Sequence, residues 1–102
     1  FHKGIDIQAP GGTAVQAVLT GRIIRDGDDP ALGRVVEIDH GQGLVTVYGT
    51  LGQVKVSMDQ VVEQGTVIAT LAAGRVAQLH FEVRQNGQAV DPTTFLTSPG
   101  KI

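Results

Sequence analysis

Two short segments near the ends of this chain carry histidine and acidic side chains at spacings that suit metal binding. In an extended strand side chains alternate between faces, so His2 and Asp6 would share one face. Gln78, His80 and Glu82 would share one face of a second strand, with apolar residues on its other face. If the two strands pair, His2, Asp6 and His80 converge. Two histidines and one aspartate are a three-ligand set for Zn²⁺ that leaves a fourth position open.

The same residues also have an ordinary explanation, which spacing alone favours. A surface His2, an Asp6 in a turn and a half-buried His80 fit the same pattern, because short motifs of this kind recur by chance. Both interpretations therefore stay open until the elements that position these side chains are considered.

Length, charge and composition bound the class of protein. The chain has 102 residues, which predicts one domain, and its net charge is −2, with eight Lys/Arg against ten Asp/Glu. Without a basic stripe, a nucleic-acid partner has no electrostatic support. The absence of cysteine excludes disulfides and thiolate ligands, and no apolar run approaches the ~20 residues of a membrane helix. The chain opens on Phe1 rather than Met, so we expect a piece of a longer protein, with any targeting segment upstream.

Glycine-containing breaks between short Val- and Ile-rich runs predict an all-β domain with many short strands. The expected strands are 14–19, 22–25, 34–39, 44–48, 54–56, 67–71, 79–84 and 89–90. The expected turns are 26–30, 40–43 and 59–65, and Asn86-Gly87 is the strongest hairpin signal. The last residues, 97–102, read as a loose tail.

Several motifs follow one another in an order that points to a known family. The segment 2–17 reads His-Lys-Gly-Ile-Asp-Ile-Gln-Ala-Pro-Gly-Gly-Thr-Ala-Val-Gln-Ala, and Gly-Arg-Ile-Ile follows at 21–24. Gly-Arg-Val-Val-Glu-Ile-Asp-His-Gly-Gln-Gly stands at 33–43 and Val-Tyr-Gly-Thr-Leu at 47–51. Leu-His-Phe-Glu-Val-Arg-Gln-Asn-Gly-Gln-Ala-Val-Asp-Pro closes the series at 79–92. Together they resemble the LytM domain of the M23 zinc metallopeptidase family, over nearly the whole chain.

This resemblance implies a compact β-sheet fold of barrel-sandwich shape, related to lipoyl domains, with a groove across one face. The domain would cover 1–96, ahead of the tail at 97–102. Carried over position by position, the resemblance implies that His2, Asp6 and His80 are zinc ligands.

Two further residues would lie beside these ligands. Glu82 shares a face with His80 and would orient that ligand, and Tyr48 would donate a hydrogen bond in the groove. His40 reads as a solvated turn histidine rather than as a relocated catalytic base.

The chain departs from the family pattern at two positions that matter for catalysis. Thr50 stands where the family has the histidine of Tyr-x-His-Leu, and Gln78 stands where it has the first histidine of His-x-His. Those histidines are thought to handle protons around a zinc-bound water. Imidazole titrates near neutral pH, whereas a threonine hydroxyl and a glutamine amide do not. The stretch from Ile68 to His80 is also shorter than usual, which predicts a more open groove.

We therefore expect a catalytically impaired, non-hydrolytic LytM-like domain of a periplasmic or other cell-envelope protein. It would activate peptidoglycan hydrolases such as cell-wall amidases, or act as a scaffold that binds peptidoglycan or a division partner. The first alternative is an active zinc metalloendopeptidase that cleaves peptidoglycan cross-links, because the ligand set is complete. The second is a lipoyl-like carrier, which we discount because Lys3, Lys55 and Lys101 do not lie in a Met-Lys-Met-like turn.

Overall fold

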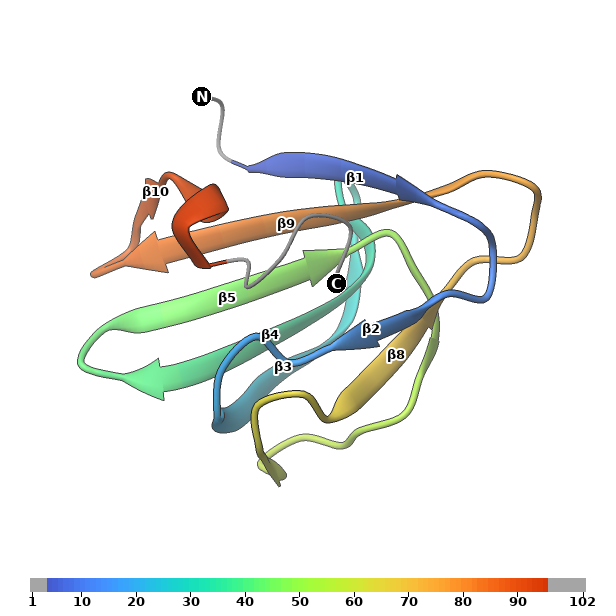
Figure 1. Ribbon diagram of the computed structural model, residues 1–102. Coiled ribbons are helices and arrows are strands. Elements are labelled where there is room, and N and C mark those ends of the chain that lie inside the picture. Colours follow the sequence, from blue (N-terminus) through green and yellow to red (C-terminus); the bar gives the residue numbers. More distant parts are fainter. Residues whose placement is uncertain (1–3, 96–102) are drawn as a thin grey trace.

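A computed structural model describes residues 4–95, and β-strands make up most of that range (Figure 1). The strands are β1 (Ile5–Ala9), β2 (Ala14–Gln16), β3 (Gly21–Asp29), β4 (Gly33–Gly41), β5 (Leu44–Gly49), β6 (Leu51–Val54), β7 (Val61–Val62), β8 (Val67–Leu71), β9 (Ala77–Gln85) and β10 (Gln88–Val90). A short 3₁₀ helix, η1 (Pro92–Phe95), follows them. The expected all-β class is confirmed. No helix within 4–95 is long and apolar enough to cross a membrane.

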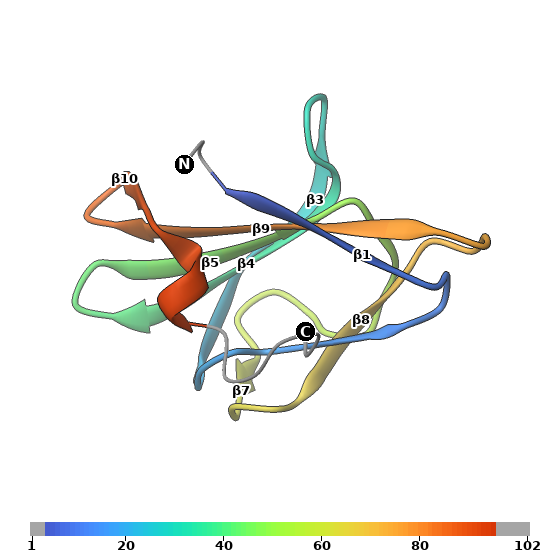
Figure 2. The same cartoon turned by 45° about the horizontal axis from the view of Figure 1, so that its top comes forward.

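The strands form two antiparallel sheets. The larger has the order β1-β9-β5-β4-β3-β7, and β10 pairs with the far end of β9. The smaller has the order β2-β8-β6. Figures 1 and 2 show the small sheet crossing one face of the large one, with β1 and β9 side by side along an edge. The other face of the large sheet is therefore left to carry polar side chains.

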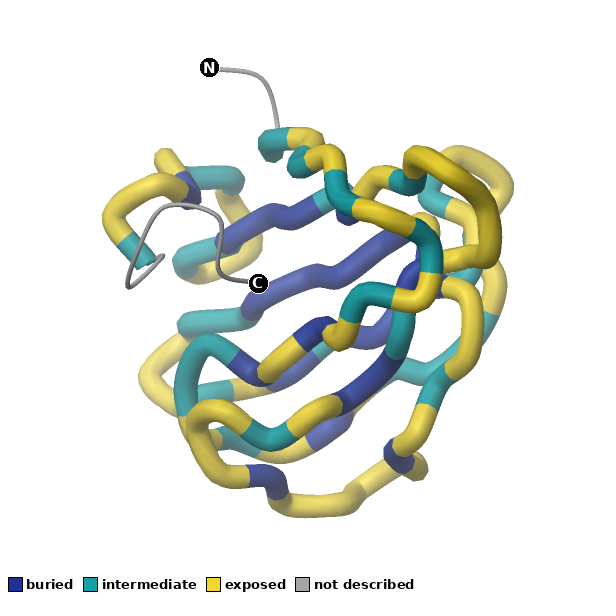
Figure 3. The backbone as a smooth tube through the Cα atoms, turned by 45° about the vertical axis from the view of Figure 1, so that its right-hand side comes forward, coloured by how far each residue is buried: buried dark blue, intermediate teal, exposed yellow. Residues whose placement is uncertain are grey.

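Apolar side chains from both sheets meet in a single core. The strand alternation expected for β9 is present, because Leu79, Phe81 and Val83 are all at most 1% exposed. The ring of Phe81 packs against Tyr48 with 5.5 Å between centroids. Burying one such side chain contributes roughly 1.5–3 kcal/mol to folding. In Figure 3 the buried positions run along the middle strands, while loops and outer strands are more exposed. The buried apolar face of β9 therefore fixes the position of its polar face.

The hairpin between β3 and β4 is longer than the sequence indicates. The expected turn at 26–30 is wrong, because β3 continues to Asp29 and the turn occupies 30–32. Asp and Gly favour turns locally, but here cross-strand ion pairs stabilise the extended form. These pairs are Arg25 with Glu37 at 3.0 Å and Arg34 with Asp26 at 2.8 Å.

Four other boundaries differ from the expectation. The strand expected at 14–19 ends at Gln16, as β2. The turn expected at 40–43 is confined to 42–43, the strand expected at 54–56 is placed earlier as β6, and the expected turn 59–65 contains β7. Pairing between strands sets these boundaries, and local composition does not record that pairing. The strand at 67–71 is confirmed.

The hairpin predicted at Asn86-Gly87 is confirmed and fixes the end of β9. Asn86 has φ of 54° and Gly87 has φ of 81°, which are the two left-handed positions of a type I′ turn. β10 then pairs back on β9, with Val90 opposite Val83.

Candidate functional site

The expected pairing of the first and last motif segments is confirmed, and its register brings Asp6 opposite His80. β1 and β9 run antiparallel, with Asp6 and His80 as direct partners. The Nδ1 atom of His80 lies 2.8 Å from Oδ1 of Asp6. The two described members of the predicted ligand set therefore meet, as strand alternation requires.

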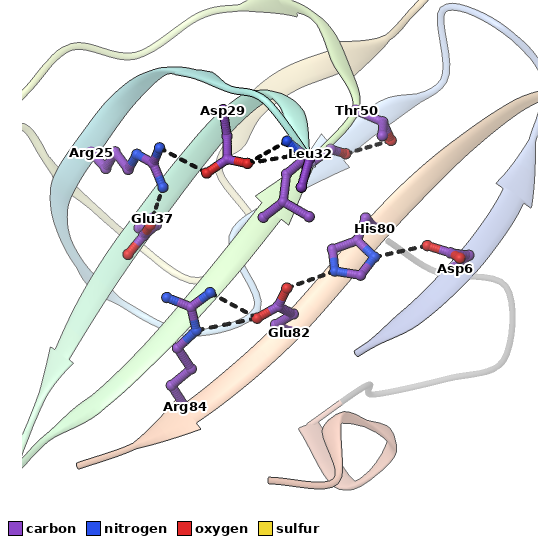
Figure 4. Close-up of polar contacts among 11 residues, drawn as sticks. Asp6, Arg25, Asp29, Leu32, Glu37, Thr50, His80, Glu82 and Arg84 are labelled. Carbon is purple, nitrogen blue, oxygen red and sulfur yellow. Dashed lines mark hydrogen bonds and ion pairs between the residues drawn. The ribbon is translucent and has the colours of Figure 1, made fainter. Parts of the chain in front are cut away.

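The second nitrogen of His80 is also engaged, on the side toward the end of β9. Its Nε2 atom lies 2.7 Å from Oε2 of Glu82, whose residue is only 3% exposed. Arg84 donates to the other oxygen of Glu82, Oε1, from Nε at 3.1 Å and from Nη2 at 2.9 Å. Figure 4 shows the resulting row, in which Asp6, His80, Glu82 and Arg84 follow one another across two strands.

The surroundings of His80 favour its protonated form. Burial by itself lowers the pKa of His80, but the hydrogen bonds to Asp6 and Glu82 and the attraction of both carboxylates raise the pKa above its ordinary value. Ionised carboxylates only accept hydrogen bonds, so the protonated ring can donate one hydrogen bond to each of them.

Gly4 makes room for this row of side chains. A Cβ atom at Gly4 would lie 2.5 Å from the carbonyl oxygen of Phe81, 2.6 Å from Cγ of Glu82 and 3.2 Å from Nε2 of His80. The glycine of the His-x-Gly-x-Asp motif is therefore needed for close approach of the chain to β9. The glycine is visible in the sequence motif, but a search for metal ligands alone gives it no role.

Gly4→Ala is expected to lower the free energy of unfolding by ~1–3 kcal/mol, the usual cost of overpacking a closely fitted site. Gly27→Ala is the matched control, because a Cβ at Gly27 would meet no atom within 4 Å. Urea denaturation of both variants gives the comparison. Equal stability of the two would contradict the close approach at Gly4.

The third predicted ligand, His2, lies outside the described residues and stays a prediction. Among residues 4–95, no three His, Cys, Asp or Glu side chains converge as a metal site. The donors that do meet, a carboxylate oxygen and an imidazole nitrogen, are of the kinds that Zn²⁺ binds in proteins. The chemistry of Asp6 and His80 therefore fits a zinc ion, with one more ligand required from outside this range.

Thr50 lies near His80, but its N–H and hydroxyl groups form hydrogen bonds with backbone carbonyl groups. It has a left-handed φ of 58°, and its N–H donates to the carbonyl of Leu32 at 2.6 Å. Its hydroxyl bonds the carbonyl of Gln78 and lies 2.7 Å from that of Gly49. Thr50 thus ties the β3–β4 hairpin tip and β9 together at this edge, as Figure 4 shows for the hairpin contact.

Gln78, the other substituted position, is exposed two residues before His80 on the same face of β9. Its Cα partner across the sheet is Gln8 of β1. A neutral amide therefore occupies the position next to the Asp6–His80 pair.

Tyr48 and His40 lie in a separate network. Tyr48 is 1% exposed, and its hydroxyl bonds Oγ1 of Thr46 at 2.9 Å and accepts from the N–H of Val18 at 3.2 Å. The expectation that His40 occupies a turn is wrong, although His40 is partly exposed to solvent as expected. His40 lies in β4, with Nε2 at 2.7 Å from Thr46 Oγ1 and Nδ1 at 2.8 Å from the carbonyl of Thr20. The structure does not bring either residue to the Asp6–His80 pair.

Alkaline pH is expected to destabilise the fold through Tyr48. Burial raises the pKa of Tyr48 to about 12, although bonds to Thr46 and Val18 act the other way. In the unfolded chain the tyrosine hydroxyl ionises near pH 10. The contribution of Tyr48 to the free energy of unfolding is therefore complete below pH 10 and is lost as pH rises to about 12. The loss amounts to ~3 kcal/mol, since each pKa unit corresponds to about 1.4 kcal/mol. Tyr48→Phe should flatten the decline of urea midpoints above pH 10, and an equally steep decline would contradict this.

Comparisons with known proteins identify one family. The model of peptidase family M23 matches residues 1–92. Stage II sporulation protein Q of Bacillus subtilis is 36% identical over 97% of this chain and 38% of its own length. Murein hydrolase activator EnvC of Escherichia coli is 38% identical over 92% of this chain and 23% of its own length.

A solved structure of a zinc-containing peptidase from Vibrio cholerae superposes with a TM-score of 0.79 at 33% identity. The match covers 87% of this chain and 28% of that chain. The present chain spans well under half the length of these three relatives. With a family match over residues 1–92, the chain belongs to peptidase family M23.

Proposed function

We propose that this chain is the non-hydrolytic M23 domain of a cell-envelope protein and that it regulates peptidoglycan hydrolases. One observation carries the proposal. At both positions where family peptidases place a proton-handling histidine, this chain has a residue that does not titrate near neutral pH, Thr50 and Gln78. In addition, the Thr50 hydroxyl is bonded to the backbone carbonyl of Gln78.

Peptide hydrolysis needs more than a bound cation. A proton must leave the attacking water and another must reach the leaving amine, and general acid–base groups contribute ~10²–10⁴-fold in rate. Neither Thr50 nor Gln78 carries such a proton at neutral pH. Gln78 retains the ability to donate a hydrogen bond, which suits binding of a carbonyl group better than its cleavage.

The cation-binding half of the site is retained. Asp6 and His80, together with His2 as the predicted third ligand, would hold Zn²⁺. A zinc ion in such a site polarises a carbonyl and lowers the pKa of bound water. Here the residues would serve recognition, because Zn²⁺ held by Asp6 and His80 would supply a positive charge close to the Gln78 position.

The relatives support an envelope role. One of them is named a murein hydrolase activator and another a sporulation protein. We therefore assign the domain to an exported protein of the periplasm or cell envelope, with a cell-wall amidase or a division protein as its partner. We place the domain at 1–96 and a tail at 97–102, which agrees with the family match to residue 92 and with η1 ending at Phe95.

Hydrolase stimulation tests the proposal. Release of dye from labelled peptidoglycan by purified cell-wall amidases is measured with and without the chain. Stimulation by the chain, with no release when the chain is alone, is expected. The regulatory role is wrong if none of the amidases from the same cell responds, and sedimentation with peptidoglycan alone would then favour a scaffold.

A further inference from the structure

Arg84 lies next to the site, and within residues 4–95 it forms no hydrogen bond or ion pair with Asp6 or His80. It is two residues beyond Glu82, so both side chains share the polar face of β9 with His80. Its guanidinium approaches one oxygen of Glu82 through two nitrogens, at 3.1 and 2.9 Å. The other oxygen of Glu82 is thereby left for Nε2 of His80, at 2.7 Å. The two oxygens of one carboxylate thus have separate partners.

Glu82 needs such a partner because it is buried. Its side chain is 4% exposed, and a carboxylate removed from water requires charge pairing and hydrogen bonds to remain in place. Arg84 supplies both and is itself 34% exposed, so its own charge keeps contact with water. Across the sheet, His80 pairs with the small Gly49, while Glu82 pairs with Val47 and Arg84 lies between Val45 and Ala89.

The arrangement has a consequence for the imidazole of His80. Both ring nitrogens face a carboxylate, but the Glu82 side chain is 4% exposed and depends on this bond, whereas the Asp6 side chain is 56% exposed and can bond water instead. In the neutral ring the hydrogen therefore stays on Nε2, facing Glu82. The nitrogen that exchanges its hydrogen for a metal is then Nδ1, which faces Asp6 at 2.8 Å. A hydrogen-bonded carboxylate behind a metal-binding histidine commonly fixes the ring and its tautomer in this way.

We propose that Arg84 is a positioning residue which, by holding Glu82, sets the orientation and tautomer of His80 so that Nδ1 and Asp6 receive a divalent cation. The inference rests on the proposed function only in that the same site takes a cation. It does not depend on whether peptide bonds are cut.

The test compares Arg84→Gln with Arg22→Gln in the full chain. Both changes remove one positive charge, and Arg22 is an exposed residue of β3. The first measurement is the ¹⁵N spectrum of the His80 ring in metal-free protein, at a pH above its pKa. Native protein and Arg22→Gln should show the hydrogen on Nε2, whereas Arg84→Gln should show a mixture of both tautomers. A merely structural role of Arg84 would not move this signature.

The second measurement is the affinity for Zn²⁺ by calorimetry, in the absence of peptidoglycan. Arg84→Gln is expected to bind ~10–100-fold more weakly than native protein, the usual effect of removing a group behind a ligand. Glu82→Gln should cost a similar factor, and the double variant should cost little more than either single one, because the two residues act as one unit.

Unchanged tautomer and unchanged zinc affinity in Arg84→Gln would overturn the proposal, as would additive effects in the double variant. If native protein binds no Zn²⁺, the role toward a cation is wrong whatever the amidase assay shows. Should Arg84→Gln fail to fold, Arg84→Lys provides the same comparison, because an ammonium retains the charge without the two-pronged contact. An intermediate loss is expected for the lysine variant, and native behaviour would count against the proposal.

Discussion

Replacing Thr50 and Gln78 together with histidine is expected to raise zinc-dependent cleavage of peptidoglycan peptides by ~10²–10⁴-fold. That factor is the usual contribution of general acid–base groups, which these two positions lack at present. Asp6 and His80, which we propose bind the cation, remain in place, so the graft supplies only the proton carriers. Product release from purified peptidoglycan, followed by chromatography, measures the gain.

The backbone at residue 50 suits this substitution. Thr50 has φ of 58°, a region in which β-branched residues are rare and histidine is enriched. The exchange relieves that strain but removes the hydroxyl bond to the carbonyl of Gln78. We therefore expect little net change in stability.

The control for the graft is Thr50→Asn with Gln78→Asn. Asparagine also tolerates a left-handed backbone and is polar, but it carries no proton near neutral pH. Cleavage should rise in the histidine pair alone. The double histidine variant could fold and bind zinc but cleave peptidoglycan no faster than the double asparagine variant. That result would show that missing proton carriers do not explain the absence of hydrolysis.

Asp6→Asn is expected to weaken Zn²⁺ binding by more than the ~10–100-fold that follows loss of a group behind a ligand, because it removes a charged ligand oxygen itself. Stability should change by less than ~1 kcal/mol, since the Asp6 side chain is 56% exposed and exposed ion pairs contribute little. Zinc calorimetry and urea denaturation separate these two effects.

Asp28→Asn is the matched control, because it makes the same chemical change at an exposed position of β3. Its zinc affinity should equal that of the native chain. Equal affinities for Asp6→Asn and native protein would remove Asp6 from the ligand set and, with it, the metal interpretation of the Asp6–His80 pair.

Strand alternation made the centre of the site predictable from the sequence. It placed His80 and Glu82 on one face of β9, and pairing of β1 with β9 then brought Asp6 to His80. Alternation also assigned Phe81 to the core, where it is fully buried. Periodicity therefore identified which side chains share a face without any knowledge of contacts.

The rest depends on register and on buried pairing, which local sequence does not determine. Nothing in the sequence around Arg84 indicates that its guanidinium bonds Glu82, or that Glu82 in turn bonds His80. The bond of His40 to Thr46 likewise arises only once β4 and β5 are aligned. The Asp and Gly residues at 26–30 predicted a turn, but ion pairs across the hairpin stabilise an extended strand there.

Peptidoglycan digestion by the native chain tests the central claim most directly. Purified peptidoglycan is incubated with zinc-supplemented chain, with and without a chelator, and the fragments are separated by chromatography beside those made by an active M23 peptidase. The account predicts no chelator-sensitive fragments from the native chain. Fragments released at a rate near that of the active peptidase, and lost in His80→Ala, would contradict it.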